Sequence, residues 1–180
     1  MARVYLSLGS NLGDRLERLR AAIERLRATR EIRFVEASRL YEAEPWETEP
    51  GEPLHRRWYL NCAVVIETPL PPERLLGHLQ AIEGALGRTR PPGTPEAGRF
   101  AARSVDIDIL FYDDRVISVS DALHVPHLLL HERAFVLRPL ADLAPELEHP
   151  ILYRTVRELL AELEDEHEVR TGDFQPRWFD

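Results

Sequence analysis

The sequence predicts an α+β fold in which strands and helices follow one another in the order β-α-β-β-α-β. Runs of alternating apolar residues mark four strands, at 3–10, 33–42, 58–67 and 104–112. Two apolar stripes with helical spacing mark a helix after the first strand and another after the third. This order predicts a ferredoxin-like βαββαβ core with a mixed, mostly antiparallel sheet, to which a hairpin and C-terminal helices are added.

The first half of the core begins with Val4, Leu6 and Leu8, which alternate along the first strand and face one side. The turn "SNLGD" follows this strand. Asp14 then begins a helix, with Glu17 at the spacing of a capping box. The buried stripe of this helix is expected to consist of Leu16, Leu19, Ile23 and Leu26.

The second half begins after a loop at 43–57 that holds three prolines and one glycine. The third strand is "WYLNCAVVIE", and Pro71 and Pro72 open the helix that follows it. The side chains expected to face the core from that helix are Leu75, Leu76, Leu79, Ile82 and Leu86. A second long loop, 87–103, leads into the fourth strand.

The remainder of the chain is expected to add elements to this core. Asp113-Asp114 is interpreted as a hairpin turn into "RVIS". Helices are expected at about 132–142 and 154–165, followed by a short strand at "HEVRT" and docking aromatics at "WF" near the C-terminus. Because no linker divides the chain, we expect one domain spanning 1–180. Long loops inside such a domain tend to be functional or disordered.

Composition narrows the classes of function. The chain has 180 residues, of which 44% are hydrophobic and 30% charged, as in ordinary globular proteins. Without an apolar run of about 20 residues or a signal-peptide pattern, it is expected to be cytoplasmic and to have no membrane partner. One cysteine, Cys62, excludes an internal disulfide. The net charge of −8 argues against a nucleic-acid partner.

All 23 basic residues are arginine. The absence of lysine excludes a lysine Schiff base and the lysine of a P-loop. If the protein handles phosphates, arginine must bind them.

Asp106 and Asp108 form the most informative pair. Residues two apart in a strand point the same way, so these carboxylates share a face about 7 Å apart, opposite Val105, Ile107 and Ile109. They would repel each other unless cations lie between them, and Mg²⁺ prefers such oxygen ligands. Two ions about 4 Å apart would fit phosphoryl transfer. The alternative is a solvated face of a half-exposed strand.

Four arginines gather in the loop that precedes this strand: Arg88, Arg90, Arg99 and Arg103. Glu96 is the only acid among them, which leaves a local charge of +3. Guanidinium matches phosphate oxygens, so the pattern indicates a polyphosphate site. We expect the loop to be mobile in the free protein and to close over the phosphates. The alternative is a solvated loop paired with acidic neighbours.

Tyr59 and Asn61 share the face of the third strand opposite Leu60. A phenol beside a carboxamide can hold a planar, nitrogen-rich ring by stacking and edge hydrogen bonds. Pro45 and Trp46 could belong to the same wall. The alternative is the polar face of an edge strand.

"HLLLH" places His127 and His131 four residues apart, which on a helix would suit zinc. A third ligand is missing from the pattern, and zinc is therefore disfavoured.

At this point the motifs resemble one family. "GSNLGD", "YLNCAV", "IEGALGRTR", "RFAARSVDIDIL" and "VPHLLLHERAFVLRPL" occur in the order found in the 6-hydroxymethyl-7,8-dihydropterin pyrophosphokinases of folate biosynthesis. The resemblance covers nearly the whole chain. It implies transfer of a diphosphate from ATP to the hydroxymethyl group of a reduced pterin, with release of AMP.

The resemblance also implies roles for individual residues. Catalysis would fall to Arg88, Arg103, Asp106 and Asp108, and the two aspartates would bind two Mg²⁺ ions that bridge the ATP phosphates. The ATP-binding set would be Glu83, Arg90, Arg99, Arg103, Ile109 and His127. The pterin-binding set would be Ala43, Pro45, Trp46, Tyr59, Asn61, Asp106, Arg133 and Phe135, with the ring between Tyr59 and Phe135.

Some positions depart from the family pattern. Leu128 and Ala122 stand where relatives can carry phosphate-binding side chains, and 43–46 replaces a more usual turn. The expected partners are ATP and the reduced pterin, with the protein a monomer or weak homodimer. The identity of a general base stays open. Two alternatives are a non-catalytic ferredoxin-like module that binds nucleotide or RNA, and a two-metal nuclease.

Overall fold

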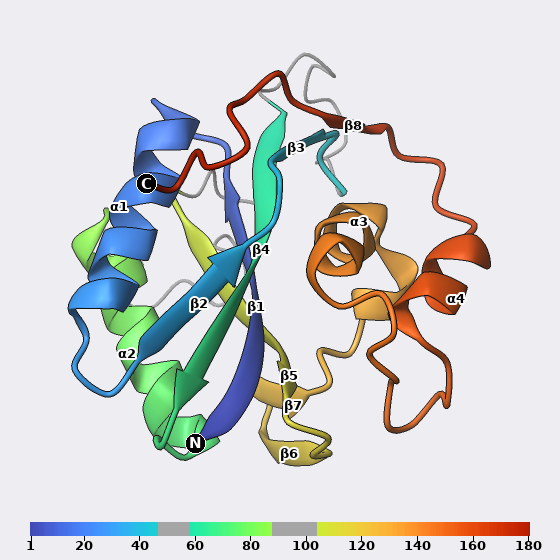
Figure 1. Cartoon of the computed structure of the whole chain (residues 1–180), viewed down its shortest axis with the longest axis horizontal. Helices are drawn as coiled ribbons and strands as arrows, with labels where there is room; N and C mark the ends of the chain where they lie inside the picture. Colours follow the sequence, from blue (N-terminus) through green and yellow to red (C-terminus); the bar gives the residue numbers. More distant parts are fainter. Residues whose placement is uncertain (47–57, 88–103) are drawn as a thin grey trace.

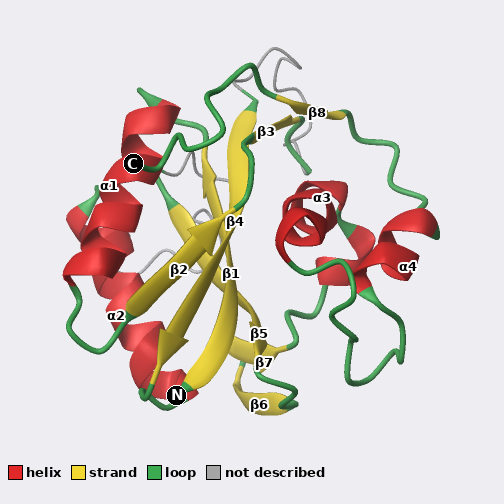
Figure 2. Cartoon of the chain, in the orientation of Figure 1, coloured by secondary structure: helices red, strands yellow, loops and turns green. Residues whose placement is uncertain are grey.

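The computed structural model describes residues 1–46, 58–87 and 104–180. A β-sheet lies between two helical layers (Figures 1 and 2). Helices α1 (Arg15–Ala28) and α2 (Pro72–Ala85) cover one face, and α3 (Ala134–Leu143) and α4 (Val156–Ala161) lie on the other. The predicted α+β class is confirmed.

Six of the described strands form the main sheet. They are β1 (Ala2–Ser10), β2 (Arg33–Ala37), β3 (Tyr41–Ala43), β4 (Tyr59–Thr68), β5 (Asp106–Tyr112) and β8 (Val169–Thr171). The order is β5-β1-β4-β3-β8, with β2 also paired to β4. Every described pairing is antiparallel, so the sheet is mostly antiparallel as predicted, and the mixed character is not seen among these strands.

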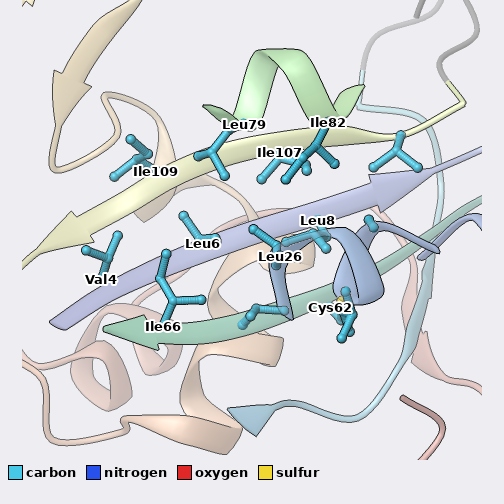
Figure 3. Close-up of a cluster of buried hydrophobic side chains, with 14 of the residues drawn as sticks. Val4, Leu6, Leu8, Leu26, Cys62, Ile66, Leu79, Ile82, Ile107 and Ile109 are labelled. Carbon is cyan, nitrogen blue, oxygen red and sulfur yellow. The ribbon is translucent and has the colours of Figure 1, made fainter. Parts of the chain in front are cut away.

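The main core lies between the sheet and helices α1 and α2 (Figure 3). Alternate residues of β1, β4 and β5 supply it, because side chains two apart share a face. These residues and their helical partners include Val4, Leu6, Leu8, Cys62, Ile66, Ile107, Ile109, Leu26, Leu79 and Ile82. The alternation predicted for the first, third and fourth strands is confirmed.

The two long helices begin as predicted. Asp14 is the N-cap of α1, and its Oδ1 accepts a hydrogen bond from the Glu17 amide at 3.0 Å. Leu19 and Ile23 are fully buried, whereas Leu16 is only partly buried. Helix α2 begins at Pro72, where a missing N–H costs nothing.

The expected second strand, 33–42, is broken in two at Ser38. Ala63 donates its amide to Ser38 Oγ at 2.9 Å, so a side chain serves where a regular strand would offer a carbonyl. Ala37 pairs with Val64 and Tyr41 pairs with Asn61, so the segment from 37 to 41 contains one residue more than the part of β4 opposite it. Trp178 is buried and donates its Nε1–H to the Ser38 carbonyl at 2.8 Å, so the expected docking of the C-terminal aromatics is confirmed.

The turn expected at Asp113-Asp114 does not form a hairpin with the strand before it. Within the described residues, β6 (Ile117–Ser120) pairs with β7 (Leu123–Val125) in a separate two-stranded sheet. Asp113 instead continues the bonding along β1: its amide donates to the Arg3 carbonyl at 2.8 Å, and its Oδ1 accepts from the Arg3 amide at 2.7 Å. The added hairpin exists, but it lies later in the chain.

The last predicted helix is shorter than expected, since α4 ends at Ala161 and not at 165. Four acids follow at 162–166, where the negative end of the helix dipole disfavours them. His127 and His131 do not share an α-helix, because His131 belongs to a short 3₁₀ turn at Leu130–Glu132 and His127 lies before that turn. No helix in the described part of the chain is long and apolar enough to cross a membrane.

Candidate active site

A pocket of about 610 Å³ is lined by the sheet face toward α3 and also by Leu76, Gln80 and Glu83 of α2. That face is divided along its length. Tyr5, Val65 and Leu110 pack into a second core with α3 and α4, while polar and small residues of the same strands line the pocket. The predicted site residues that line it are Trp46, Tyr59, Asn61, Glu83, Asp106, Asp108, Ile109, His127, Arg133 and Phe135.

Asp106 and Asp108 line the pocket from β5, and both are half-buried. Across the β1–β5 pairing they face Gly9 and Ser7 respectively. These small partners leave space beside both carboxylates. The side chain of Ile109 belongs to the opposite core and is only 5% exposed, so this residue can offer the pocket mainly its backbone.

The donor set suits a hard divalent cation. Two carboxylates on one strand face supply the oxygen ligands that Mg²⁺ prefers. Among the described residues no group of three or more His, Cys, Asp or Glu could hold a metal. The remaining ligands would therefore come from phosphate and water, as is usual for Mg²⁺.

Glu83 holds the beginning of the aspartate strand. Its side chain reaches from α2, is 2% exposed, and accepts a hydrogen bond from the Ile107 amide at 2.8 Å through Oε1. Ile107 lies between the two aspartates, so this bond fixes the backbone that carries them. A buried carboxylate is costly unless hydrogen-bonded in this way.

Asn61 lines the pocket and carries a buried donor. The residue is 3% exposed, and its Nδ2 has no hydrogen-bond partner among the described residues. Leaving such a group unpaired costs about 1–3 kcal/mol. Gly9 lies opposite Asn61 on β1, and a Cβ there would come within 2.8 Å of Asn61 Oδ1. Glycine at position 9 therefore gives the Asn61 side chain its room.

Aromatic rings form the wall at the other end of the pocket. The Trp46 and Phe135 rings meet edge to face, with centroids 6.1 Å apart. The Arg133 guanidinium lies 5.5 Å from the Trp46 ring centroid and 5.7 Å from that of Phe135. At these distances the guanidinium cation is attracted to the faces of both aromatic rings.

Ala43 and Pro45 are not among the lining residues. Ala43 is 1% exposed and packs with Ala134 and Val169 in a small core. Ala43 belongs to β3 and lies between β4 and β8, where it pairs with Tyr59 and Val169. The pterin contact expected of Ala43 from sequence stays a prediction.

His127 is neutral at physiological pH. Burial, and then the positive charge of Arg133, lower the pKa of His127 from 6.5 to about 4, against the opposing effect of Asp106. Its Nδ1 accepts a hydrogen bond from the Leu129 amide at 3.3 Å. The ring proton therefore lies on Nε2, which leaves one donor. Leu128 and Ala122 also line the pocket, and neither can bind phosphate through its side chain.

The arginines Arg88, Arg90, Arg99 and Arg103 lie outside the described residues, and so does the loop expected to close. Lining residues that sequence reasoning missed include Ser7, Gly9, Gln80, Asp121, His124 and Leu129. The sequence indicated the orientation of Ser7 and Gly9, because the alternation of β1 places them on the face opposite to that of the buried Leu6 and Leu8. Only the register between β1 and β5 brings them beside the aspartates.

Comparison with known proteins gives the class and the family. Residues 5–145 match the family model for 7,8-dihydro-6-hydroxymethylpterin-pyrophosphokinase. A 2-amino-4-hydroxy-6-hydroxymethyldihydropteridine pyrophosphokinase of Methylorubrum extorquens is 44% identical over 164 residues, which cover 91% of this chain and 95% of that protein. The folic acid synthesis protein fol1 of Schizosaccharomyces pombe is 40% identical over 161 residues, 88% of this chain but 20% of that protein.

Solved structures support the fold. A crystal structure of Plasmodium falciparum HPPK-DHPS A437G with SDX-DHP aligns with a TM-score of 0.66 at 17% identity. The alignment covers 89% of this chain and 45% of the other, so the chain spans under half of that longer protein.

The class defined by these matches is that of the pyrophosphokinases. The chain belongs to the 7,8-dihydro-6-hydroxymethylpterin-pyrophosphokinase (HPPK) family. Membership confirms the family, enzyme class and reaction predicted from sequence: transfer of a pyrophosphoryl group from ATP to hydroxymethyldihydropterin in folate biosynthesis.

Proposed function

We propose that the pocket on the α3 face is where this chain carries out the pyrophosphoryl transfer, with the ATP phosphates beside Asp106 and Asp108 and the pterin beside Asn61. One observation supports this most strongly. The two carboxylates and the buried Asn61 amide line the same pocket from strands β5 and β4, which both pair with β1.

At the phosphate end, Asp106 and Asp108 would hold two Mg²⁺ ions. Bound there, the metal would neutralise phosphate charge and align the attacking and leaving oxygens. Glu83 keeps the strand between the aspartates in place through the Ile107 amide. His127 would donate its Nε2–H to a phosphate oxygen without adding a positive charge.

The arginines expected from sequence, Arg88, Arg90, Arg99 and Arg103, would supply the remaining positive charge. Guanidinium groups suit this role because they bind phosphate oxygens in pairs. Their number agrees with a reaction in which three phosphates must be neutralised.

At the pterin end, Asn61 would hydrogen-bond the ring edge and Tyr59 and Phe135 would lie against its faces. The unsatisfied Nδ2 of Asn61 supports this role, because a ring acceptor would recover the cost of burying it. Trp46 and Arg133 line the same end. Asp106 lines the pocket together with the residues of both ends and would touch both substrates.

For the whole chain, we infer a ferredoxin-like core acting as one domain over 1–180, as a monomer or weak homodimer. The order β5-β1-β4 with β2 and β3 together as the second strand supports this topology, because both helices α1 and α2 lie on one face.

The test is AMP release. Purified protein with Mg²⁺ and ATP should release AMP only when 6-hydroxymethyl-7,8-dihydropterin is added, and mass spectrometry should find the pterin diphosphate in equal amount. Controls omit the pterin, replace Mg²⁺ with a chelator, and replace the pterin with single-stranded DNA or RNA. AMP release without pterin, or nucleic-acid cleavage, would overturn the proposal in favour of a nuclease. Binding of ATP without turnover would favour the non-catalytic module.

A further inference from the structure

Trp46 is held by the C-terminal segment of the chain. The His167 ring stacks on the Trp46 indole, with centroids 4.7 Å apart and an interplanar angle of 27°. Two hydrogen bonds join the segments beside this contact: Glu44 donates its amide to the Glu168 carbonyl at 3.0 Å, and the Glu168 amide donates to the Glu44 side chain at Oε2, at 2.9 Å. Strand β8 lies alongside β3 in Figure 1.

Asp165 connects this stack to the start of α3. Its Oδ1 accepts from the His167 amide at 3.0 Å and from His167 Nδ1 at 2.6 Å. Its Oδ2 accepts from the Ala134 amide at 2.8 Å. The side chain is 1% exposed, so both oxygens are committed to these donors.

The carboxylate is ionised in this setting. Burial by itself would raise the pKa of Asp165, but hydrogen bonds from Ala134 and His167 bring it below its usual value. An anion at the N-terminus of α3 is also favoured by the helix dipole. Arg133, the N-cap residue, makes no side-chain cap of its own.

The Asp165 carboxylate therefore holds the neighbours of two aromatic residues that line the pocket. Phe135 follows Ala134 at the beginning of α3, and Trp46 rests on His167. Both rings line the pocket and contact each other. Residues 165 and 167 lie beyond the 5–145 segment that matches the family model, whereas Trp46 and Phe135 lie within it.

We propose that Asp165 is a positioning residue that sets the placement of the Trp46 and Phe135 rings, and hence the affinity for the pterin but not for ATP. This inference rests on the proposed function, because it needs the pterin to bind at the aromatic end. Asp165 does not touch the substrate and acts through His167 and the Ala134 amide.

The experiment compares Asp165→Ala with a control that loses the same kind of contact elsewhere. Thr155 caps α4 by accepting from the Glu158 amide at 3.2 Å, and α4 does not contribute to the pocket. Asp165→Ala should raise KM and Kd for the pterin about tenfold and leave the ATP values within about twofold. Thr155→Ala should lower the melting temperature to a similar degree while both KM values stay within about twofold.

A second pair of variants separates ring stacking from hydrogen bonding. His167→Ala removes the ring under Trp46 and should raise the pterin KM several-fold. His167→Phe retains a flat ring and should recover most of that loss. Because His167→Ala leaves the Asp165–Ala134 bond intact, it decides the question if Asp165→Ala fails to fold.

Equal pterin KM values in Asp165→Ala and Thr155→Ala, or an unchanged KM in His167→Ala, would overturn the inference while leaving the proposed function intact. A wild-type protein without pterin-dependent AMP release would instead remove the proposed function and this inference with it.

Discussion

Asp106 and Asp108 lie across from Gly9 and Ser7 respectively, two small residues of the neighbouring strand β1. The same alternation that buries Ile107 turns both carboxylates to the pocket. A pair of like charges in this position is unfavourable unless a cation joins it. Their function should therefore be separable from folding.

Asp106→Asn and Asp108→Asn should each fold and lose most activity. Loss of a preorganised electrostatic contact costs roughly 100- to 1,000-fold in kcat. Steady-state kinetics over a range of Mg²⁺ concentrations checks this. Near wild-type rates at saturating Mg²⁺ would contradict a metal-binding role.

Gly9→Ala should weaken pterin binding more than it weakens the fold. The new Cβ would lie 2.8 Å from Asn61 Oδ1, so the Asn61 side chain must shift. Gly77→Ala is a matched control, because nothing lies within 4 Å of that Cβ on α2 and alanine favours helices by about 1 kcal/mol. Calorimetric titration of both variants with pterin measures the difference. Unchanged pterin affinity in Gly9→Ala would contradict the close approach.

His127 should make the free protein less stable in mild acid. Its folded-state pKa of about 4 lies below its value of 6.5 in the unfolded chain, so protonation favours unfolding. The free energy of unfolding should fall by up to about 3 kcal/mol as pH drops from 6.5 to 4. Urea titrations of wild type and His127→Gln across this range test the point. A variant with the same pH slope as wild type would assign the effect to other groups.

The helices and strands predicted well are those whose own apolar residues follow a regular spacing. β1, β4, β5, α1 and α2 each carry a full period of apolar residues. The break between β2 and β3 was not predicted, because it depends on Ser38 bonding to Ala63 and on Trp178 arriving from the C-terminus. The pairing of β6 with β7 was missed for a similar reason, since bonds from Asp113 to Arg3 replace the turn.

The same distinction applies to the candidate site. The orientation of the aspartate pair and of Tyr59 with Asn61 followed from alternation within single strands. The nearness of Gly9 to Asn61, and the stack of His167 on Trp46, follow from contacts across strands that no local pattern encodes. The roles assigned to the site residues remain predictions.

Trp178→Ala should destabilise the chain between β2 and β3 at Ser38, and with it the whole fold. The indole is 1% exposed and bonds the Ser38 carbonyl, and large core truncations cost about 3–5 kcal/mol. Trp178→Phe keeps much of the packing and loses the donor, which should cost about 1–3 kcal/mol. Urea denaturation with Trp58→Ala as a control for a half-buried tryptophan measures the two. Equal losses at positions 58 and 178 would contradict the anchoring role.

On the scale of the molecule, one sheet serves two environments. The face toward α1 and α2 is apolar along its length, while the opposite face is apolar under α3 and polar at the pocket. A substrate on the polar part therefore contacts strand residues whose immediate neighbours in the sequence point into the main core. Binding there should stabilise the whole molecule, because ligand that binds only the folded state adds to its free energy of unfolding.

Cys62 allows the rate at which the sheet opens to be measured by thiol labelling. It lies next to Asn61 on β4 but points into the main core, 1% exposed, where burial also raises the pKa of its thiol. A disulfide reagent can reach the sulfur only when the strands part, so its reaction rate reports how often they do. As the sole cysteine, it gives one unambiguous signal. Pterin with Mg²⁺ and an ATP analogue should slow labelling in proportion to ligand saturation, and labelling as fast as in urea would show that the centre of the sheet is open.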